Sequence, residues 1–318
     1  MPPNGSARRI AWLFAILRFG LNVHLIRFIL YPNAGRKWRR PLQGDLVKLT
    51  VRRAINMTIE DIRTEQREGV RTIRFERPAK RNSLARPHLD YLRELLIEYA
   101  NDPSVRCLVI TGSGTAFCAG ADIEEWAQAE AEGELEIYGW TDKAHAFVRE
   151  LAAFPRPTVA ALNGSAVGAG TDIGFACDFR IASASASLRC GYTGMGYSPD
   201  MGGTWFLPRI ARPDVVKRFI FLNERWAAQA AHAAGLLSEV VDDERFEQHV
   251  AQFADRLASG PSVAFGHTKA LLASSFSRSL AEQLHYELAA GVACGLSEDG
   301  QEALRASVQG RAPQLVGR

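Results

Sequence analysis

The sequence predicts an α/β fold that continues into a helical C-terminal part. Short apolar segments alternate with amphipathic helical segments over residues 57–212, and helical patterns dominate after about Pro213. Alternating strands and helices followed by helices alone are typical of an α/β domain with a helical extension. Two glycine-rich turns, at 114–123 and 163–172, each follow an expected strand and precede an expected helix. These turns mark the points where the fold can present backbone groups to a ligand.

The elements of this fold can be assigned in chain order. Residues 70–75 alternate apolar and polar side chains, which predicts a half-buried strand. A helix is predicted over 87–100, because a proline begins it and leucines recur on one face. The apolar runs at 107–112 and 158–162 predict two buried strands that end in glycine turns. A late helix is predicted over 279–294.

Charge divides the chain into a basic leader and an acidic body. Residues 1–56 carry eleven Lys or Arg and one acid, a net +10 within a chain total of +3, which leaves −7 for the rest. We predict a leader at 1–56 that is disordered or precedes the natural start of the domain at Met57. A basic amphipathic helix at a membrane surface and a transit peptide are the alternatives. Arg18 and Arg27 interrupt its apolar stretch, so a membrane span is not expected.

Composition restricts the class of protein and its partners. The five cysteines form no CxxC pair and are odd in number, which indicates reduced core residues of a cytoplasmic protein. The seven histidines form neither HxxxH nor HExxH, so we expect no metal site. Neither glycine-rich turn spells a nucleotide-binding GxGxxG. The acidic body disfavours a nucleic-acid or membrane partner. We divide the body into a core at 57–255 and a C-terminal helical region at 256–318.

The two glycine-rich turns carry the candidate chemistry. A helix N-terminus has backbone N–H groups that find no partner inside the helix. Two such ends that meet can hold an oxyanion between two amides, and small residues let the backbone approach closely. On the pattern alone, tight packing of a helix on a strand is the favoured explanation of these glycines.

Several segments resemble the crotonase, or enoyl-CoA hydratase/isomerase, superfamily. The most recognisable are AFCAGADI at 116–123, NGSAVGAGTDIGFACDFRIAS at 163–183 and GYSPDMGGTWFLPRI at 196–210. ERPAKRNSL at 76–84 resembles the family's first strand and turn, and the GQEALRASVQGRAP ending resembles its closing helix. The similarity extends over 57–318. It implies a spiral core of repeated β-β-α units, a C-terminal helical trimerisation region, and a homotrimer or homohexamer.

The resemblance also implies a binding site for an acyl-CoA thioester, with no cofactor beyond the coenzyme A carried by the substrate. The family's oxyanion amides correspond to the backbone N–H groups of Ala121 and Ala169. The same resemblance implies substrate or CoA contacts by Ala119, Gly120, Asp122, Gly168, Lys80, Arg81 and Lys269. For each of the three cations, a solvated surface charge is the simpler explanation. Asp122 has the alternative role of shaping its loop.

The candidate catalytic side chains depart from the family's usual hydratase pattern. Typical hydratases of the family have two glutamates that flank a water, and the corresponding positions here are Asp172 and Tyr192. A tyrosine, with a reference pKa of about 10, is a poor base. Asp200 resembles the catalytic aspartate of the dienoyl-CoA isomerases and the oxepin-forming isomerases. We assign Asp172, Tyr192 and Asp200 as candidate catalytic residues. A turn cap at Asp200 and a helix-dipole role for Asp172 are the alternatives.

The leading hypothesis is a cofactor-free enzyme that isomerises or hydrates the double bond of an enoyl-CoA. A thioester hydrolase or decarboxylase on the same fold, and a non-catalytic acyl-CoA-binding scaffold, are the alternatives. Trp126 and Trp140 flank the Ala- and Glu-rich segment 127–136, which in the resembled family often forms a flexible wall of the acyl pocket. His145 is expected at the surface or in the lining of that pocket.

Overall fold

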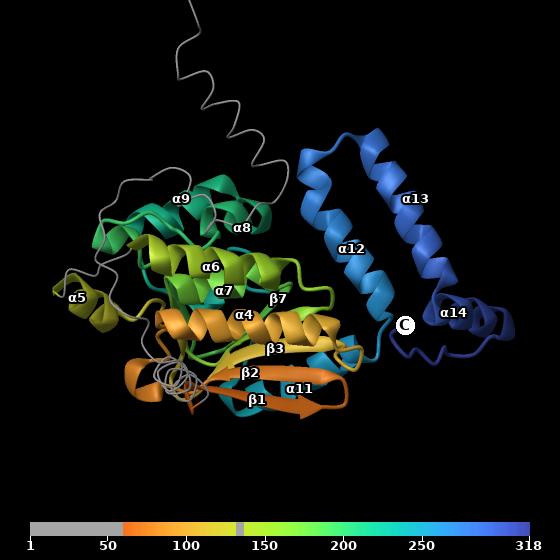
Figure 1. Ribbon diagram of the computed structural model, residues 1–318, viewed down its shortest axis with the longest axis horizontal. Coiled ribbons are helices and arrows are strands. Elements are labelled where there is room, and N and C mark those ends of the chain that lie inside the picture. Colours follow the sequence, from red (N-terminus) through yellow and green to blue (C-terminus); the bar gives the residue numbers. More distant parts are fainter. Residues whose placement is uncertain (1–59, 132–136) are drawn as a thin grey trace, which may run out of the picture. The chain divides into compact units, whose positions relative to one another are not determined.

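The computed structural model describes residues 60–131 and 137–318, which form the expected α/β fold. The leader predicted at 1–56 and the proposed start at Met57 lie outside the described residues. Half of the predicted pocket wall at 127–136 lies outside them as well, because the description stops at residue 131 and resumes at 137. Figure 1 shows the described elements from β1 to α14.

Two sheets form the centre of the described fold. The larger sheet has six strands in the order β1-β2-β3-β5-β7-β10, and all neighbours are parallel except the pair β1–β2. The smaller sheet has four strands in the order β4-β6-β8-β9, with only β9 antiparallel. The strands are β1 (Ile62–Arg67), β2 (Val70–Phe75), β3 (Cys107–Gly112), β4 (Ala116–Cys118), β5 (Thr158–Leu162), β6 (Ser165–Val167), β7 (Phe179–Ser183), β8 (Ser187–Arg189), β9 (Trp226–Ala227) and β10 (Glu239–Val241).

A repeated unit relates the two sheets. The pairs β3–β4, β5–β6 and β7–β8 follow one another along the chain, and each pair contributes one strand to each sheet. Helices α5 and α6 follow the first pair and α7 follows the second. Parallel neighbours require such crossover connections. The predicted β-β-α spiral core is therefore confirmed.

Helices cover the sheets and make up most of the chain after the last repeat. The predicted helix at 87–100 is α4, and the one at 279–294 is α13, each with bounds that differ by one or two residues. The α-helices are α4 (Arg86–Asn101), α5 (Ile123–Ala131), α6 (Ile137–Ala152), α7 (Ala169–Ala176), α8 (Gly203–Ile210), α9 (Pro213–Leu222), α10 (Ala228–Ala233), α11 (Phe246–Ala258), α12 (Ser262–Ser274), α13 (Leu280–Leu296) and α14 (Glu298–Gln309). Short 3-10 helices are η1 (Pro78–Lys80), η2 (Thr193–Met195), η3 (Asp243–Arg245) and η4 (Ser275–Ser277).

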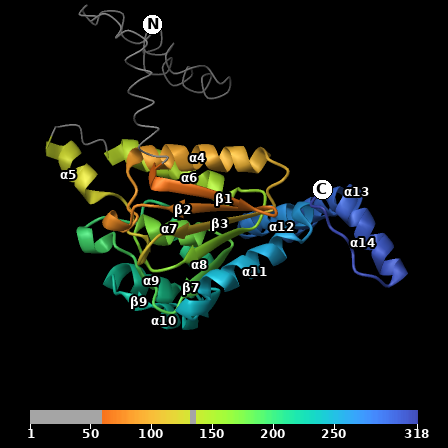
Figure 2. The ribbon, with the colours of Figure 1, turned by 90° about the horizontal axis from the view of Figure 1, so that it is seen from below.

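The central strand β3 is buried on both faces, which explains its continuous apolar run. Leu108 and Ile110 belong to the main core with α4 and α6, whereas Cys107 and Val109 pack in a second cluster with α11. Figure 2 shows α4 and α6 on one side of β1–β3 and α11 on the other. The predicted strands at 70–75, 107–112 and 158–162 are confirmed as β2, β3 and β5.

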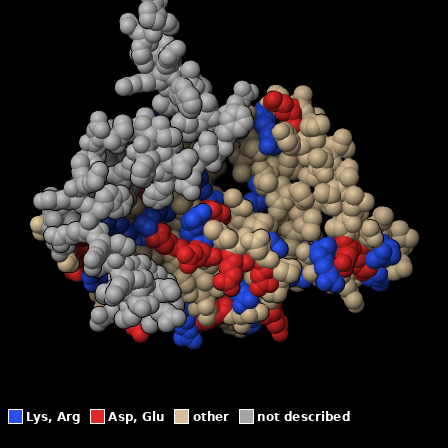
Figure 3. All heavy atoms as spheres, viewed as in Figure 1, with Lys and Arg blue, Asp and Glu red and all other residues tan. Residues whose placement is uncertain are grey.

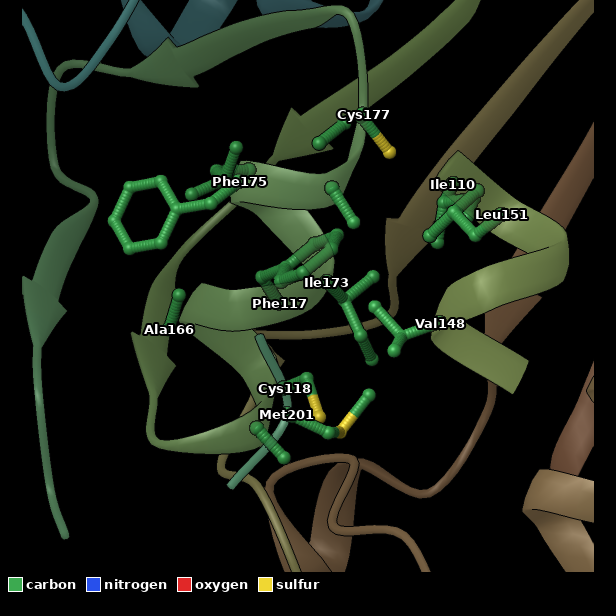
Figure 4. Packing of buried hydrophobic residues seen from close by; sticks show 14 of the residues in the cluster. Ile110, Phe117, Cys118, Val148, Leu151, Ala166, Ile173, Phe175, Cys177 and Met201 are labelled. Carbon is green, nitrogen blue, oxygen red and sulfur yellow. The ribbon is translucent and has the colours of Figure 1, made fainter. Parts of the chain in front are cut away.

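Helix α7 is buried along its whole length. Figure 4 shows Ile173 of this helix among Phe117, Cys118 and Val148 of the main core. A Cβ atom at Gly170 would lie 2.2 Å from the carbonyl oxygen of Cys118, so glycine allows α7 to approach β4 this closely. The close contact fixes the N-terminus of α7 beside the turn that follows β4.

The C-terminal helices carry an exposed apolar face. Helices α12, α13 and α14 pack in sequence, each against the next. Leu280, Leu284 and Leu288 recur at intervals of four on one face of α13 and are 74, 53 and 67% exposed. In Figure 3 the surface over α12 and α13 is largely free of charged side chains. Large exposed apolar faces usually mark contact surfaces.

None of the helices in residues 60–131 and 137–318 combines the length and apolar character needed to cross a bilayer.

Candidate active site

The two glycine-rich turns meet at one point of the fold. Gly120 has a φ of +91°, and a Cβ atom built on it would lie 3.3 Å from the amide nitrogen of Ala169. The backbone of Leu84 also holds this turn. The Leu84 N–H donates to the Gly120 carbonyl at 2.8 Å, and the Leu84 carbonyl accepts from the Asp122 N–H at 3.0 Å. These contacts use the residues on either side of Ala121, and the Ala121 N–H has no acceptor among residues 60–131 and 137–318.

The Ala169 amide is also free of protein acceptors. Ala169 is the first residue of α7, so its N–H has no partner within the helix, and the preceding Gly168 supplies no side-chain cap. Across the described residues, neither the Ala121 N–H nor the Ala169 N–H donates a hydrogen bond. Two unpartnered amides close to one another can hold a developing oxyanion.

A cavity of about 330 Å³ lies beside the two amides. Its lining is mostly small, apolar or aromatic, and it draws on both glycine-rich turns and on the segment 189–200. The predicted site residues that line it are Ala119, Gly120, Ala121, Gly168, Ala169, Tyr192 and Asp200. Residues distant in sequence are thus brought to one cavity, as the resemblance implied.

Asp200 lines this cavity and has one carboxylate oxygen without a partner among the described residues. Its Oδ1 atom is buried and has no hydrogen-bond partner among the described residues. The Oδ2 atom lies 3.5 Å from Oγ1 of Thr141, and His145 Nε2 lies 2.7 Å from the main-chain oxygen of Asp200. Burial raises the pKa of Asp200 above its ordinary value. The group is therefore a weaker acid, and its carboxylate a better proton acceptor, than an exposed aspartate.

Asp172 contacts the Tyr192 hydroxyl and is not among the residues that line the cavity. The Tyr192 hydroxyl donates to Oδ2 of Asp172 at 2.8 Å, and the backbone N–H groups of Met201 and Gly203 also donate to this carboxyl group. Burial raises the pKa of Asp172 to about 7. Burial and both neighbouring carboxyl groups, Asp172 and Asp200, raise the pKa of Tyr192 well above its ordinary value. Tyr192 thus stays protonated and separates the two acids.

Ion pairs hold the turn at Asp122. Oδ2 of Asp122 lies 3.1 Å from Nη2 of Arg77 and 3.2 Å from Nζ of Lys80. Lys80 also pairs with Glu124 at 2.9 Å. Asp122 is buried, so these contacts shape the loop that carries the Ala121 amide. The CoA contacts predicted for Lys80 and Asp122 remain predictions.

The two other predicted CoA contacts lie away from the cavity. Nζ of Lys269 is 2.9 Å from Oδ2 of Asp178, and Lys269 lines a different cavity between α8 and α12. Arg81 lines a separate polar groove along β6 and β8, which it shares with Arg189. Of these residues, only Arg189 also lines the cavity beside the amides. Their roles in CoA binding stay predictions.

Sequence reasoning missed several residues that line the cavity. Oδ1 of Asn223 accepts a hydrogen bond from the Gly191 N–H at 2.7 Å and so holds the loop that carries Tyr192. Asn223 ends α9 with a φ of +51°, and an asparagine directly after an apolar helical run is a recognisable helix stop. Met195 and Tyr197 also line the cavity, and nothing in the local pattern distinguishes them.

Comparison with known proteins gives consistent matches. A family model described as enoyl-CoA hydratase/isomerase matches residues 65–317. The chain is 33% identical over 262 residues to 1,2-epoxyphenylacetyl-CoA isomerase of Escherichia coli (strain K12), covering 82% of this chain and 100% of that protein. It is 30% identical over 261 residues to crotonyl-CoA hydratase of Syntrophomonas wolfei, covering 82% of this chain and 99% of that protein.

Solved structures agree with these matches. An enoyl-CoA hydratase from Bacillus anthracis has a TM-score of 0.76 and 31% identity, with 81% of this chain and 100% of that chain covered. The Pseudomonas aeruginosa protein PA4980 has a TM-score of 0.69 and 52% identity, with 72% of this chain and 98% of that chain covered.

The buried carboxyl group of Asp172 should make stability depend on pH. Its pKa rises from an ordinary 3.8 to about 7 on folding, so the folded chain keeps a proton that the unfolded chain releases. The free energy of unfolding should therefore fall by roughly a few kcal/mol between about pH 4 and pH 7 and stay level at higher pH. Urea unfolding of the wild type and of Asp172→Asn at several pH values in this interval measures the free energy of unfolding. The variant should lack this slope, and an unchanged slope would contradict the assignment.

Proposed function

This chain belongs to the crotonase (enoyl-CoA hydratase/isomerase) family, and we propose that it moves a carbon–carbon double bond within an acyl-CoA thioester. One observation carries the proposal. Two unpartnered amides, at Ala121 and Ala169, lie beside a cavity whose only carboxylate among the described residues is Asp200. The amides are suited to hold the thioester oxygen, and the carboxylate is suited to move a proton between carbons.

The amides act on the charge that develops during proton removal. When carbon 2 of the acyl chain loses a proton, negative charge moves onto the thioester oxygen and an enolate forms. Donors that are already in position stabilise this charge without reorganising, and each can contribute about 3 kcal/mol. Because the contacts use main-chain N–H groups, alanine at positions 121 and 169 serves as well as glycine would.

Asp200 transfers the proton. Its carboxylate takes a proton from carbon 2 of a 3-enoyl thioester, and the double bond moves from carbons 3 and 4 to carbons 2 and 3. The same carboxyl group then returns the proton to carbon 4, so no atom is gained or lost. A general base works best when its pKa approaches the working pH, and burial raises the pKa of Asp200 in that direction.

The arrangement of acids favours isomerisation over hydration. Hydration needs a second acid–base group that holds a water molecule opposite the first. Tyr192 stands at the position of the second glutamate of typical hydratases, and its hydroxyl already donates a hydrogen bond to Asp172. Relatives with 30–33% identity include both a named isomerase and a named hydratase. The choice of isomerisation therefore rests on Asp200 as the single carboxylate that lines this cavity among the described residues.

The proposed chemistry requires no cofactor beyond the coenzyme A of the substrate.

Burial raises the pKa of Cys107, Cys118 and Cys177 to about 12, which leaves these thiols unreactive. Buried thiols of this kind fit the reducing cytoplasm, which we propose as the location of the protein.

We further propose that the chain forms a homotrimer or homohexamer through the apolar face of α13. Leu288→Glu would place a charge in that contact and should dissociate the oligomer. Analytical ultracentrifugation should give three or six times the 35.0 kDa chain mass for the wild type and a smaller species for the variant. Phe221→Glu, at a similarly exposed apolar residue of α9, is the matched control and should keep the wild-type mass. A monomeric wild type would contradict the assembly.

The carboxylate assignment predicts a large loss of turnover in Asp200→Asn. With 3-hexenoyl-CoA as substrate, the absorbance of the conjugated product should appear roughly 100-fold or more slowly than in the wild type. Asp214→Asn, at an exposed aspartate of α9 outside the cavity, should retain wild-type turnover.

Other products would point to other reactions on the same fold. Loss of crotonyl-CoA absorbance with no isomerisation of 3-hexenoyl-CoA would favour a hydratase, and release of free thiol would favour a hydrolase. Tight binding of the thioesters without any turnover would favour a non-catalytic scaffold. Each of these results would contradict the proposed isomerisation, as would full activity of Asp200→Asn.

A further inference from the structure

Three aromatic side chains form one wall of the cavity beside the amides. Trp126 of α5, Trp140 of α6 and Tyr197, which follows η2, all line it. The Trp126 ring centroid lies 5.8 Å from that of Trp140 and 6.0 Å from that of Tyr197, with interplanar angles of 78° and 73°. These are edge-to-face contacts, the geometry that aromatic rings prefer over face-to-face stacking. The wall is thus an ordered set of rings.

Main-chain contacts fix this aromatic wall relative to the candidate oxyanion site. The indole N–H of Trp140 donates to the Leu84 carbonyl at 3.4 Å, and the same carbonyl accepts from the Asp122 N–H at 3.0 Å. Leu84 also donates to the Gly120 carbonyl. Ala121 lies between these two partners of Leu84 in the chain. An acyl group whose thioester oxygen binds at Ala121 therefore shares one small cavity with the rings.

The cavity lining continues into apolar side chains that are left open to solvent. Ile123, Met195 and Tyr197 line the cavity and are 46, 51 and 44% exposed. Exposed apolar side chains that gather in one place usually mark a binding surface. A volume of about 330 Å³ is near the lower end of the range for ligand cavities, roughly 300–1,000 Å³. The space is therefore large enough to hold an apolar acyl group.

We propose that the aromatic wall of Trp126, Trp140 and Tyr197 selects acyl-CoA thioesters whose acyl group ends in an aromatic ring. This inference rests on the proposed function for the thioester and goes beyond it by naming the acyl group. A phenyl ring can add an edge-to-face contact with Trp126 or Tyr197. A saturated ring buries a similar apolar area but lacks the charge distribution that favours this contact.

Three thioesters with the same number of acyl carbons test the preference on the full chain. They are 5-phenyl-3-pentenoyl-CoA, 5-cyclohexyl-3-pentenoyl-CoA and 3-undecenoyl-CoA. The wild type should show a kcat/KM for the phenyl substrate that is about 3- to 10-fold higher than for the cyclohexyl substrate. Trp126→Leu should remove this ratio, whereas Trp126→Phe, which keeps a ring, should retain it. Tyr197→Leu, at a half-exposed residue, is a second variant if Trp126→Leu does not fold.

The outcomes separate this inference from the proposed function. Equal kcat/KM values for the phenyl and cyclohexyl substrates, a preference for the straight chain, or a ratio that survives both leucine variants would overturn the inference while isomerisation stands. If no thioester is converted, the proposed function fails, and calorimetric dissociation constants of 5-phenylpentanoyl-CoA and 5-cyclohexylpentanoyl-CoA decide the inference. A phenyl preference that is lost in Trp126→Leu would support it, and equal affinities would overturn it.

Discussion

The close approach of α7 to the turn after β4 is the contact on which the candidate site depends. A Cβ atom at Gly170 would lie 2.2 Å from the Cys118 carbonyl oxygen, and one at Gly120 would lie 2.8 Å from the Val167 carbonyl oxygen. Side chains at these positions would force the two segments apart. Because the segments touch, the unpartnered amide that follows Gly120 and the one that begins α7 lie close together. Backbone packing alone thus brings together the two amides that we propose as oxyanion donors.

The same packing determines what the carboxyl groups can do. Burial of all of α7 carries Asp172 into the core, where its pKa rises to about 7 and the Tyr192 hydroxyl becomes its partner. Asp200 comes from the loop before α8, lines the cavity, and has one oxygen that finds no partner in the part of the chain that the structure describes. In the proposed reaction, backbone dipoles stabilise the oxygen while one carboxylate handles the proton. Dividing these tasks between rigid backbone and a single acid suits a reaction that only relocates a proton.

Local sequence patterns predicted the elements well and the tertiary contacts poorly. The strands β2, β3 and β5 were predictable because apolar runs and alternation report burial directly. Strands of two or three residues, such as β9 and β10, are too short for such a signal. The family motifs predicted the amides of Ala121 and Ala169 as the oxyanion site, and that role stays a prediction. That Asp172 lies behind Tyr192, and that Tyr197 meets Trp126, depends on contacts between segments that are distant in sequence.

The carbonyl stretch of a bound thioester tests the role of the two amides most directly. Crotonyl-CoA labelled with carbon-13 at the thioester carbonyl can be bound to Asp200→Asn, which should slow turnover, and examined by difference infrared spectroscopy. Two N–H donors polarise the carbonyl, so its stretch should move to lower frequency than in free crotonyl-CoA. A stretch that stays at the free frequency while the thioester is bound would contradict an oxyanion site at Ala121 and Ala169.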